Sequence, residues 1–125
     1  MSVIPQNPVT AQDNMSIKEP AFSPRVFITQ ETDLDLVKAT RFGELSALVP
    51  YRMNVVMQPS DVINTLYEKL ADYSPEDFLL PTGDPVIIGL AFTVASQMSL
   101  GHLRVLKWDR MINDYYAVRL NLNDR

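Results

Sequence analysis

The feature that most constrains the fold is a short apolar strand that leads directly into an uncharged helix. Residues 78–81 (Phe-Leu-Leu-Pro) are wholly apolar, which is typical of a strand buried on both faces. In the turn that follows, Gly83 permits a sharp bend, Asp84 can cap a helix, and Pro85 suits the first helical position. The helix then runs to about Leu100 without any Asp, Glu, Lys or Arg. This pattern predicts a sheet whose faces are covered by other elements.

A second helix, with a clear amphipathic pattern, precedes this stretch. It opens at Pro59-Ser60-Asp61, where Ser60 is a suitable N-cap and Asp61 complements the positive end of the helix dipole. At 3.6 residues per turn, one set of apolar side chains falls on a single face and the polar side chains take the other. The apolar set is Val62, Ile63, Leu66, Tyr67, Leu70 and Tyr73. We expect this helix to pack on the sheet and to end at residues 74–77.

Runs of β-branched and aromatic residues predict the strands of the N-terminal half. Residues 25–29, 44–49 and 53–57 are the three candidates, and each is ended by a proline or a polar stretch. Residues 34–42 mix apolar and charged side chains without a clean period, so we expect a packed loop there.

The C-terminal residues predict an antiparallel hairpin. Residues 102–108 form one strand, residues 109–114 a polar turn, and residues 115–122 a second strand whose even-numbered side chains are apolar. The order of elements favours an α/β (or α+β) fold: a single mixed β-sheet with two helices and this hairpin, parallel in both strand–helix–strand units. We assign residues 25–125 to one α/β domain. Residues 1–24, with four prolines and no periodicity, form a flexible arm.

Composition excludes several classes of chemistry. The chain has no cysteine, which excludes disulfides, thiolate zinc sites, iron–sulfur clusters and cysteine nucleophiles. The single histidine, His102, cannot supply the several imidazoles of a transition-metal site, and no serine or carboxylate is spaced to orient it as a base. We therefore expect no catalytic residue, no metal site and no cofactor. Without a signal-peptide pattern or a bilayer-spanning apolar run, we expect a cytoplasmic protein with no membrane partner.

The distribution of charge argues against nucleic acid as a partner. The net charge is −4, and residues 30–85 hold ten acidic and four basic side chains, a local balance of −6. Residues 101–125 hold five basic and three acidic side chains, a balance of +2. Strong duplex binding needs a concentrated basic surface, and two excess positive charges spread over a hairpin are a poor footprint.

The turn formed by Thr82, Gly83 and Asp84 is the best candidate for binding a small molecule. Open α/β sheets bind ligands at the carboxyl ends of strands, where helix N-termini present N–H groups to anions. Neither phosphate-loop motif is present, however, and the Asp84 carboxylate would repel a phosphate at the same amides. The alternative is a turn that serves only to start the helix.

Aromatic and basic residues on the hairpin form a candidate protein interface. Trp108, Arg110 and Tyr115 provide the mixture of aromatic and cationic side chains that is common at protein hot spots. Cross-strand packing of the aromatic rings explains the same residues equally well.

The outward side of the uncharged helix is a second candidate interface. It carries small or apolar residues where an exposed helix normally has charges: Gly89, Phe92, Thr93, Ser96 and Leu100. Residues 34–42, the arm, or the same helix of a second subunit are candidates to cover it. We favour the second subunit, because two-fold homodimers are the commonest oligomers.

The first strand and the C-terminal half together resemble a group of viral sequences. Residues 77–85 read Asp-Phe-Leu-Leu-Pro-Thr-Gly-Asp-Pro and precede the apolar helix. Residues 104–110 read Arg-Val-Leu-Lys-Trp-Asp-Arg, and Tyr115-Tyr116 follow. This pattern is similar to that of small bacteriophage-encoded proteins, a group with no established activity. The resemblance implies a viral origin and a place in the bacterial cytoplasm or the virion, and it transfers no functional residue.

Two hypotheses follow. The first is a small non-enzymatic interaction or assembly protein, encoded by a phage, that binds itself or another protein. The alternative is a ligand-binding or enzymatic α/β domain that uses the turn from Thr82 to Asp84. Under the first hypothesis, substitutions on the uncharged helix or the hairpin abolish function, and under the second, substitutions in the turn do so.

Overall fold

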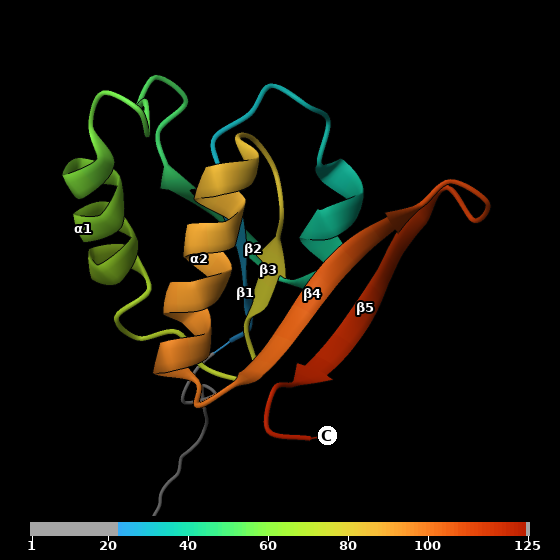
Figure 1. Cartoon of the computed structure of the whole chain (residues 1–125). Helices are drawn as coiled ribbons and strands as arrows, with labels where there is room; N and C mark the ends of the chain where they lie inside the picture. Colours follow the sequence, from blue (N-terminus) through green and yellow to red (C-terminus); the bar gives the residue numbers. More distant parts are fainter. Residues whose placement is uncertain (1–22, 125) are drawn as a thin grey trace, which may run out of the picture.

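The structure, a computed structural model, describes residues 23–124, so the predicted flexible arm (1–24) lies outside the described residues except for its last two. These residues form five strands and three helices, of which η1 is a 3₁₀ helix (Figure 1). In chain order they are β1 (Arg25–Gln30), η1 (Val37–Phe42), β2 (Glu44–Val49), α1 (Pro59–Lys69), β3 (Phe78–Leu80), α2 (Pro85–Met98), β4 (His102–Asp109) and β5 (Asp114–Asn121).

One mixed sheet holds all five strands, in the order β2-β1-β3-β4-β5. The first four strands run parallel to their neighbours, and β5 pairs with β4 as an antiparallel hairpin. This confirms the predicted fold class, the parallel strands in both strand–helix–strand units and the C-terminal hairpin.

The central strands of the sheet are covered on both faces, as the wholly apolar strand β3 predicts. Helices α1 and α2 lie side by side on one face, over a core that includes Leu66 and Ile87. On the other face, η1 contributes Ala39 to a second core. The strand members of that second core are Val26, Ile28, Phe78, Leu80, Leu106 and Tyr115. Successive strand residues point to opposite faces, so the central strands supply both cores.

The predicted strand at residues 53–57 is wrong. These residues form turns, because the Asn54 side chain accepts hydrogen bonds from the N–H groups of Val56 (2.7 Å) and Met57 (3.2 Å) and so bends the backbone. Residues 34–42 were expected to form a packed loop, but most of them form the 3₁₀ helix η1.

Helix α1 starts and ends differently from the prediction. Its N-cap is Gln58, which makes no side-chain capping bond, so Ser60 is not the cap. Pro59 occupies the first turn, where its missing N–H needs no partner. The helix ends at Lys69, before Tyr73, although Tyr73 is buried as the apolar pattern predicts.

A buried carboxylate fixes the connection from α1 to β3. Asp77 is fully buried and accepts hydrogen bonds from the Arg25 backbone N–H (3.0 Å), the Arg25 guanidinium Nη2 (2.9 Å) and the Ser74 N–H (3.0 Å). The same guanidinium reaches the exposed Asp72 carboxylate at 3.1 Å. The start of β1 is thereby tied to the residue that precedes β3.

Candidate functional site

The predicted ligand turn lies at the carboxyl end of β3, and its polar groups are already hydrogen-bonded. Gly83 has φ +91°, the positive value expected for the bend. Asp84 is the N-cap of α2 and accepts from the N–H of Val86 at 2.8 Å, while the Asp84 N–H donates to Gln30 Oε1 at 2.9 Å. An anion at this helix N-terminus would have to displace the Gln30 and Asp84 side chains. These bonds support a role in starting the helix, and a ligand role for Thr82, Gly83 and Asp84 stays a prediction.

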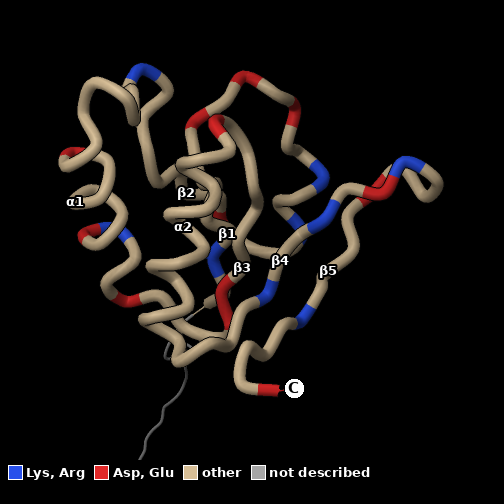
Figure 2. Tube along the Cα trace, in the orientation of Figure 1, with Lys and Arg blue, Asp and Glu red and all other residues tan. Residues whose placement is uncertain are grey.

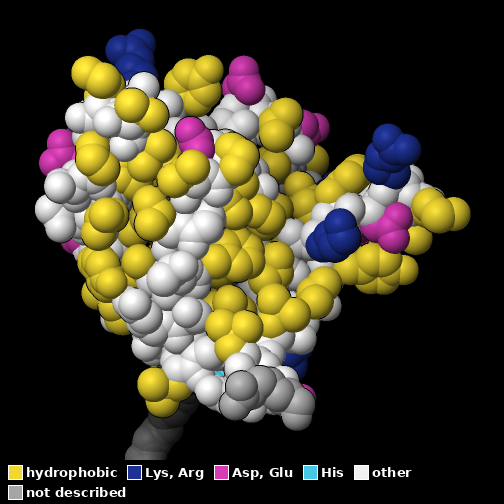
Figure 3. Space-filling model, in the orientation of Figure 1, with side chains coloured by type: hydrophobic (Ala, Val, Ile, Leu, Met, Phe, Trp, Pro, Cys, Tyr) yellow, Lys and Arg dark blue, Asp and Glu magenta, His cyan; other side chains and the backbone are white. Residues whose placement is uncertain are grey.

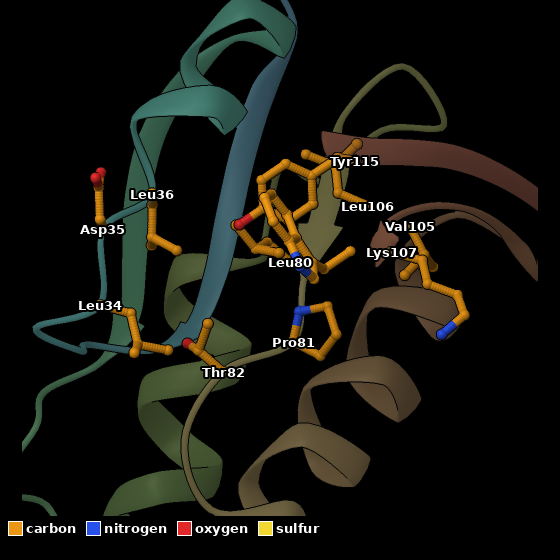
Figure 4. Close-up of a pocket in the computed structure, with 11 residues that line it drawn as sticks. Leu34, Asp35, Leu36, Leu80, Pro81, Thr82, Val105, Leu106, Lys107 and Tyr115 are labelled. Atoms are coloured by element: carbon orange, nitrogen blue, oxygen red, sulfur yellow. The ribbon is translucent and has the colours of Figure 1, made fainter. Parts of the chain in front are cut away.

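A cleft of about 660 Å³ opens beside this turn, mainly on the η1 face of the sheet, where β4 extends past the end of β3 (Figure 4). Thr82 is the residue of the predicted turn that lines it. The other lining residues are Leu34, Asp35, Leu36, Leu80, Pro81, Val105, Leu106, Lys107, Trp108 and Tyr115. The connections of neighbouring strands diverge here, because β1 continues through η1 on one face and β3 continues through α2 on the other. Open α/β sheets commonly bind ligands at such switch points.

The walls of the cleft are mainly apolar. Trp108 packs edge-on against Tyr115, with ring centroids 5.0 Å apart, and the Lys38 ammonium lies 5.8 Å from the centre of the Trp108 ring. Figure 4 shows the Asp35 carboxylate and the Lys107 ammonium pointing away from the centre of the cleft. Burial in the cleft wall raises the pKa of the Tyr115 hydroxyl above its ordinary value. The cleft therefore offers an aromatic and aliphatic surface.

The residues predicted as interfaces lie on two different faces of the sheet. Trp108 and Tyr115 line the cleft on the η1 face, where they form a cross-strand pair. Arg110 lies in the turn between β4 and β5. The remaining predicted residues belong to α2, on the opposite face: Gly89, Phe92, Thr93 and Ser96.

The hairpin also carries apolar side chains on the α2 side of the sheet, opposite to Trp108 and Tyr115. Val118 pairs with Val105, and Leu120 pairs with Leu103, a member of the core under α2. Directly paired side chains point to the same face, so the even-numbered side chains of β5 face the α2 side. We name this surface the α2–β5 face. It comprises Phe92 of α2 and Tyr116, Val118 and Leu120 of β5, and the turns that follow these two elements add the exposed Leu100 and Leu122 beside it.

The α2–β5 face exposes large apolar side chains. Leu100 is 79% exposed, Leu122 58%, Tyr116 52% and Leu120 37%. Figure 3 shows hydrophobic side chains extending from α2 across the front of β4 and β5. Among residues 23–124, no helix covers β5 on this face (Figure 1). The site prediction from sequence included the α2 residues and missed those of β5, although the alternation in β5 indicates one apolar side.

Charged side chains gather in separate regions (Figure 2). Many acidic ones lie on α1 and on the loops at the carboxyl ends of the parallel strands, and basic ones follow η1, β4 and β5. His102 is exposed at the start of β4. Within the described residues, no three His, Cys, Asp or Glu side chains are placed to hold a metal ion. In that same part of the chain, no helix has the length and apolar character needed to cross a membrane.

A protein-family model matches residues 24–122, a range that holds every described strand and helix. The chain belongs to the phage Pam3 gp32-like protein family. This confirms the resemblance to bacteriophage-encoded proteins that the motifs at residues 77–85 and 104–110 indicate. No curated protein and no solved structure matches the chain. The cleft and the α2–β5 face both lie within the part of the chain that the Pam3 gp32-like model covers.

Proposed function

We propose that this phage protein is a small non-enzymatic interaction or assembly protein that binds a protein partner, itself or another, in the host cytoplasm or on the virion. One observation carries the proposal: large apolar side chains are exposed together on the α2–β5 face and at the hairpin tip. Soluble monomers usually expose such side chains singly, and contiguous apolar patches mark surfaces that bind other molecules.

The exposed set is large enough to supply binding energy. At the hairpin tip, Met111 is 95% exposed and Ile112 is 48% exposed. On the α2–β5 face, Tyr116 and Leu122 are each more than half exposed. Full burial of one such side chain stabilises a complex by roughly 1.5–3 kcal/mol, and a few central residues dominate the affinity of most interfaces.

The polar groups beside the cleft support an interaction role over a catalytic one. Thr29 Oγ1 donates to the Thr82 carbonyl at 2.6 Å, and Thr82 Oγ1 donates to the Gln30 carbonyl at 2.5 Å. The Asp84 carboxylate caps α2. These groups hold the end of β3 against β1, so a reaction that used them would disturb the fold.

The test compares two exposed tyrosines. Tyr116→Ser removes aromatic area from the α2–β5 face, and Tyr51→Ser removes the same side chain from a loop position that is 68% exposed. The tagged chains are expressed during phage infection, and the co-purifying proteins and the solution mass are measured. We expect Tyr116→Ser alone to lose its partner, whether a phage protein or a second copy. Binding that is unchanged in both folded variants would contradict the proposal.

A second candidate function is the binding of a small apolar or aromatic ligand in the cleft. The position of the cleft at the switch point of the sheet favours it. Trp108 is the single tryptophan of the chain, so its fluorescence reports directly on this cleft. With anilinonaphthalene sulfonate as the ligand, we expect the fluorescence of Trp108 to change with a saturable dependence on the dye concentration. The Leu34→Glu substitution should abolish this change. A change that does not saturate, or that persists in Leu34→Glu, would count against this candidate.

A further inference from the structure

We propose that the edge of β4 that faces the cleft binds an extended peptide segment of a partner protein, which pairs with Trp108 as an added strand. The site lies where β4 runs on past the end of β3, so it is separate from the α2–β5 face. The inference goes beyond the proposed function, and neither depends on the other.

The register of the hairpin determines which backbone groups of β4 face β3. The Leu122 N–H donates to the Gly101 carbonyl at 2.8 Å, and these two residues lie opposite each other, one step beyond the last pair of the ladder. In an antiparallel ladder, hydrogen-bonded pairs alternate with pairs that are not bonded. The backbone groups of the odd-numbered residues of β4 therefore point to β5. Those of the even-numbered residues, which include Leu106 and Trp108, point to β3.

Strand β3 uses only the first part of this edge. Leu79 is paired with Val105, and because the backbone of Val105 bonds to β5, the parallel pattern directs the Leu106 N–H to the Leu79 carbonyl. The next residue in line to donate to β4 is Pro81, which has no N–H. The ladder between β3 and β4 therefore ends at Leu106.

Trp108 is left with two free backbone groups on this side. Among residues 23–124, its N–H and its carbonyl have no hydrogen-bond partner. The chain after β3 bonds to β1 instead, since the Thr82 N–H donates to Thr29 Oγ1 at 2.8 Å. Trp108 is 40% exposed, so a partner can reach it. A donor and an acceptor on one strand residue match the backbone of an extended chain, which can bond to both in either direction.

The cleft follows the free edge of β4. Residues 105–108 all line it, and because successive side chains point to opposite faces, a cleft that contacts all four runs along the edge of the strand. Figure 4 shows Leu34 and Leu36 across the cleft from Tyr115. Every second side chain of an added strand would lie against these residues and the Trp108 ring. We therefore expect the peptide to carry large apolar residues at alternate positions.

Amide hydrogen exchange of the full chain, followed by NMR, tests the free edge. The probe is a blocked seven-residue peptide in which threonine alternates with phenylalanine or valine. In the free protein, we expect the Trp108 N–H to exchange faster than the Lys107 N–H, which bonds to β5. At a peptide concentration about ten times its Kd, exchange at Trp108 should slow about tenfold.

Three results of this experiment would overturn the proposal. The first is a Trp108 N–H that is already protected in the free chain, because another segment of the protein then occupies the edge. The second is a Trp108 N–H that the peptide does not protect. The third is protection at Ala117 in place of Trp108, because the backbone of Ala117 lies on the outer edge of β5.

N-methylated peptides separate backbone pairing from apolar contact. Two analogues carry methyl groups on alternate amides, so that the methyl groups point to β4 in one analogue and away from it in the other. We expect one analogue to lose binding and the other to keep it, since only one set of amides can donate to the Trp108 carbonyl. If both analogues bind as well as the parent peptide, side chains alone hold it and the proposal fails.

Two substitutions at equally exposed side chains locate the bound peptide. Leu34 lines the cleft and is 64% exposed, whereas Val37 lies in η1 outside the lining residues and is 63% exposed. We expect Leu34→Glu to raise the Kd of the peptide roughly tenfold and Val37→Glu to leave it unchanged, as measured by the fluorescence of Trp108. Equal effects would contradict the proposal. Tyr116→Ser lies on the other face and should not change this Kd, so the peptide site can fail while the proposed function holds.

Discussion

Helices α1 and α2 lie side by side on one face of the sheet, and both bury an apolar stripe against it. Leu66 of α1 is fully buried, and Ile87 of α2 is 1% exposed. Their outward sides differ, because α1 carries charges there and α2 carries none between residues 85 and 101. The charged residues of α1 are Asp61, Glu68 and Lys69. The inward apolar stripe therefore explains how each helix packs on the sheet. The charged outward side of α1 is suited to contact with solvent, and the uncharged outward side of α2 is suited to contact with another protein surface.

The two helices also end by different means. After α1, the chain is held by the ion pairs of Arg25 with Asp72 and Asp77. After α2, it is held without ion pairs: Leu100 has φ +55°, the Gly101 N–H donates to the Ser96 carbonyl at 2.8 Å, and the Asn123 side-chain amide donates to the Leu100 carbonyl at 2.8 Å. The Gly101 bond is that of a Schellman cap, which needs no charge. The uncharged character of α2 thus extends through its carboxyl end.

The largest effect is expected from a substitution in the connection that follows α1. Asp77→Ala leaves the Arg25 guanidinium without its buried partner, and we expect the free energy of unfolding to fall by about 3–5 kcal/mol. Asp72→Ala removes a partner of the same guanidinium whose side chain is 75% exposed, and it should cost less than about 1 kcal/mol. Urea unfolding measures both values. Equal losses would show that the burial of Asp77 is not what stabilises this connection.

The next effect is a pH dependence beside the same connection. Tyr73 is 4% exposed, and burial raises its pKa to about 12, with the Asp77 carboxylate adding to the shift. An unfolded tyrosine titrates near about pH 10, so stability is unaffected below that pH and falls by about 2 kcal/mol as the pH rises toward 12. Tyr73→Phe should remove this loss, because it removes the ionisable hydroxyl. Thermal unfolding as a function of pH measures the stability of both proteins. An equal loss of stability at alkaline pH in wild type and Tyr73→Phe would mean that another titratable group causes the loss.

A smaller loss of stability is expected from a substitution at the start of α2, which is built differently from the start of α1. α1 begins without a side-chain cap, whereas the start of α2 depends on Gly83 and Asp84. Gly83→Ala forces a side chain to φ +91° and places its Cβ 2.5 Å from Gln30 Cβ, so we expect a loss of about 2 kcal/mol. Chemical unfolding at neutral pH measures it. If Gly83→Ala is as stable as wild type, the turn can change conformation at no cost, even though the new Cβ displaces the Gln30 side chain that accepts from the Asp84 N–H.

Local signals in the sequence predict most of the elements. Strand β3 and the Gly83-Asp84-Pro85 turn follow from side-chain size, backbone freedom and capping, which act within a few residues. The false strand at 53–57 has a local cause as well, since apolar composition outweighed the turn-forming side chain of Asn54 in the prediction.

The candidate surfaces depend on register, which no local signal reports. Trp108 and Tyr116 are both aromatic hairpin residues, yet one lines the cleft and the other lies on the α2–β5 face. The side of the sheet on which a given β5 residue falls is fixed by strand pairing and by the position of η1 relative to α2. Sequence reasoning therefore identified Trp108 and Tyr115 of the cleft and the residues of α2 as two surfaces, but it missed that β5 adds apolar side chains to the α2 side.

The smallest expected effect compares one exposed position in each of the two helices. Gly89 is exposed in the middle of α2, and nothing lies within 4 Å of the position that a Cβ would take. Alanine is favoured over glycine inside a helix by about 0.5–1 kcal/mol, so Gly89→Ala should stabilise the chain by that amount. Asn64→Ala, at an exposed position of α1, is the matched control and should give a gain of similar size, because alanine is also favoured over asparagine inside a helix. Thermal unfolding measures both variants. If Asn64→Ala stabilises the chain and Gly89→Ala destabilises it, another part of the chain or a partner already covers Gly89.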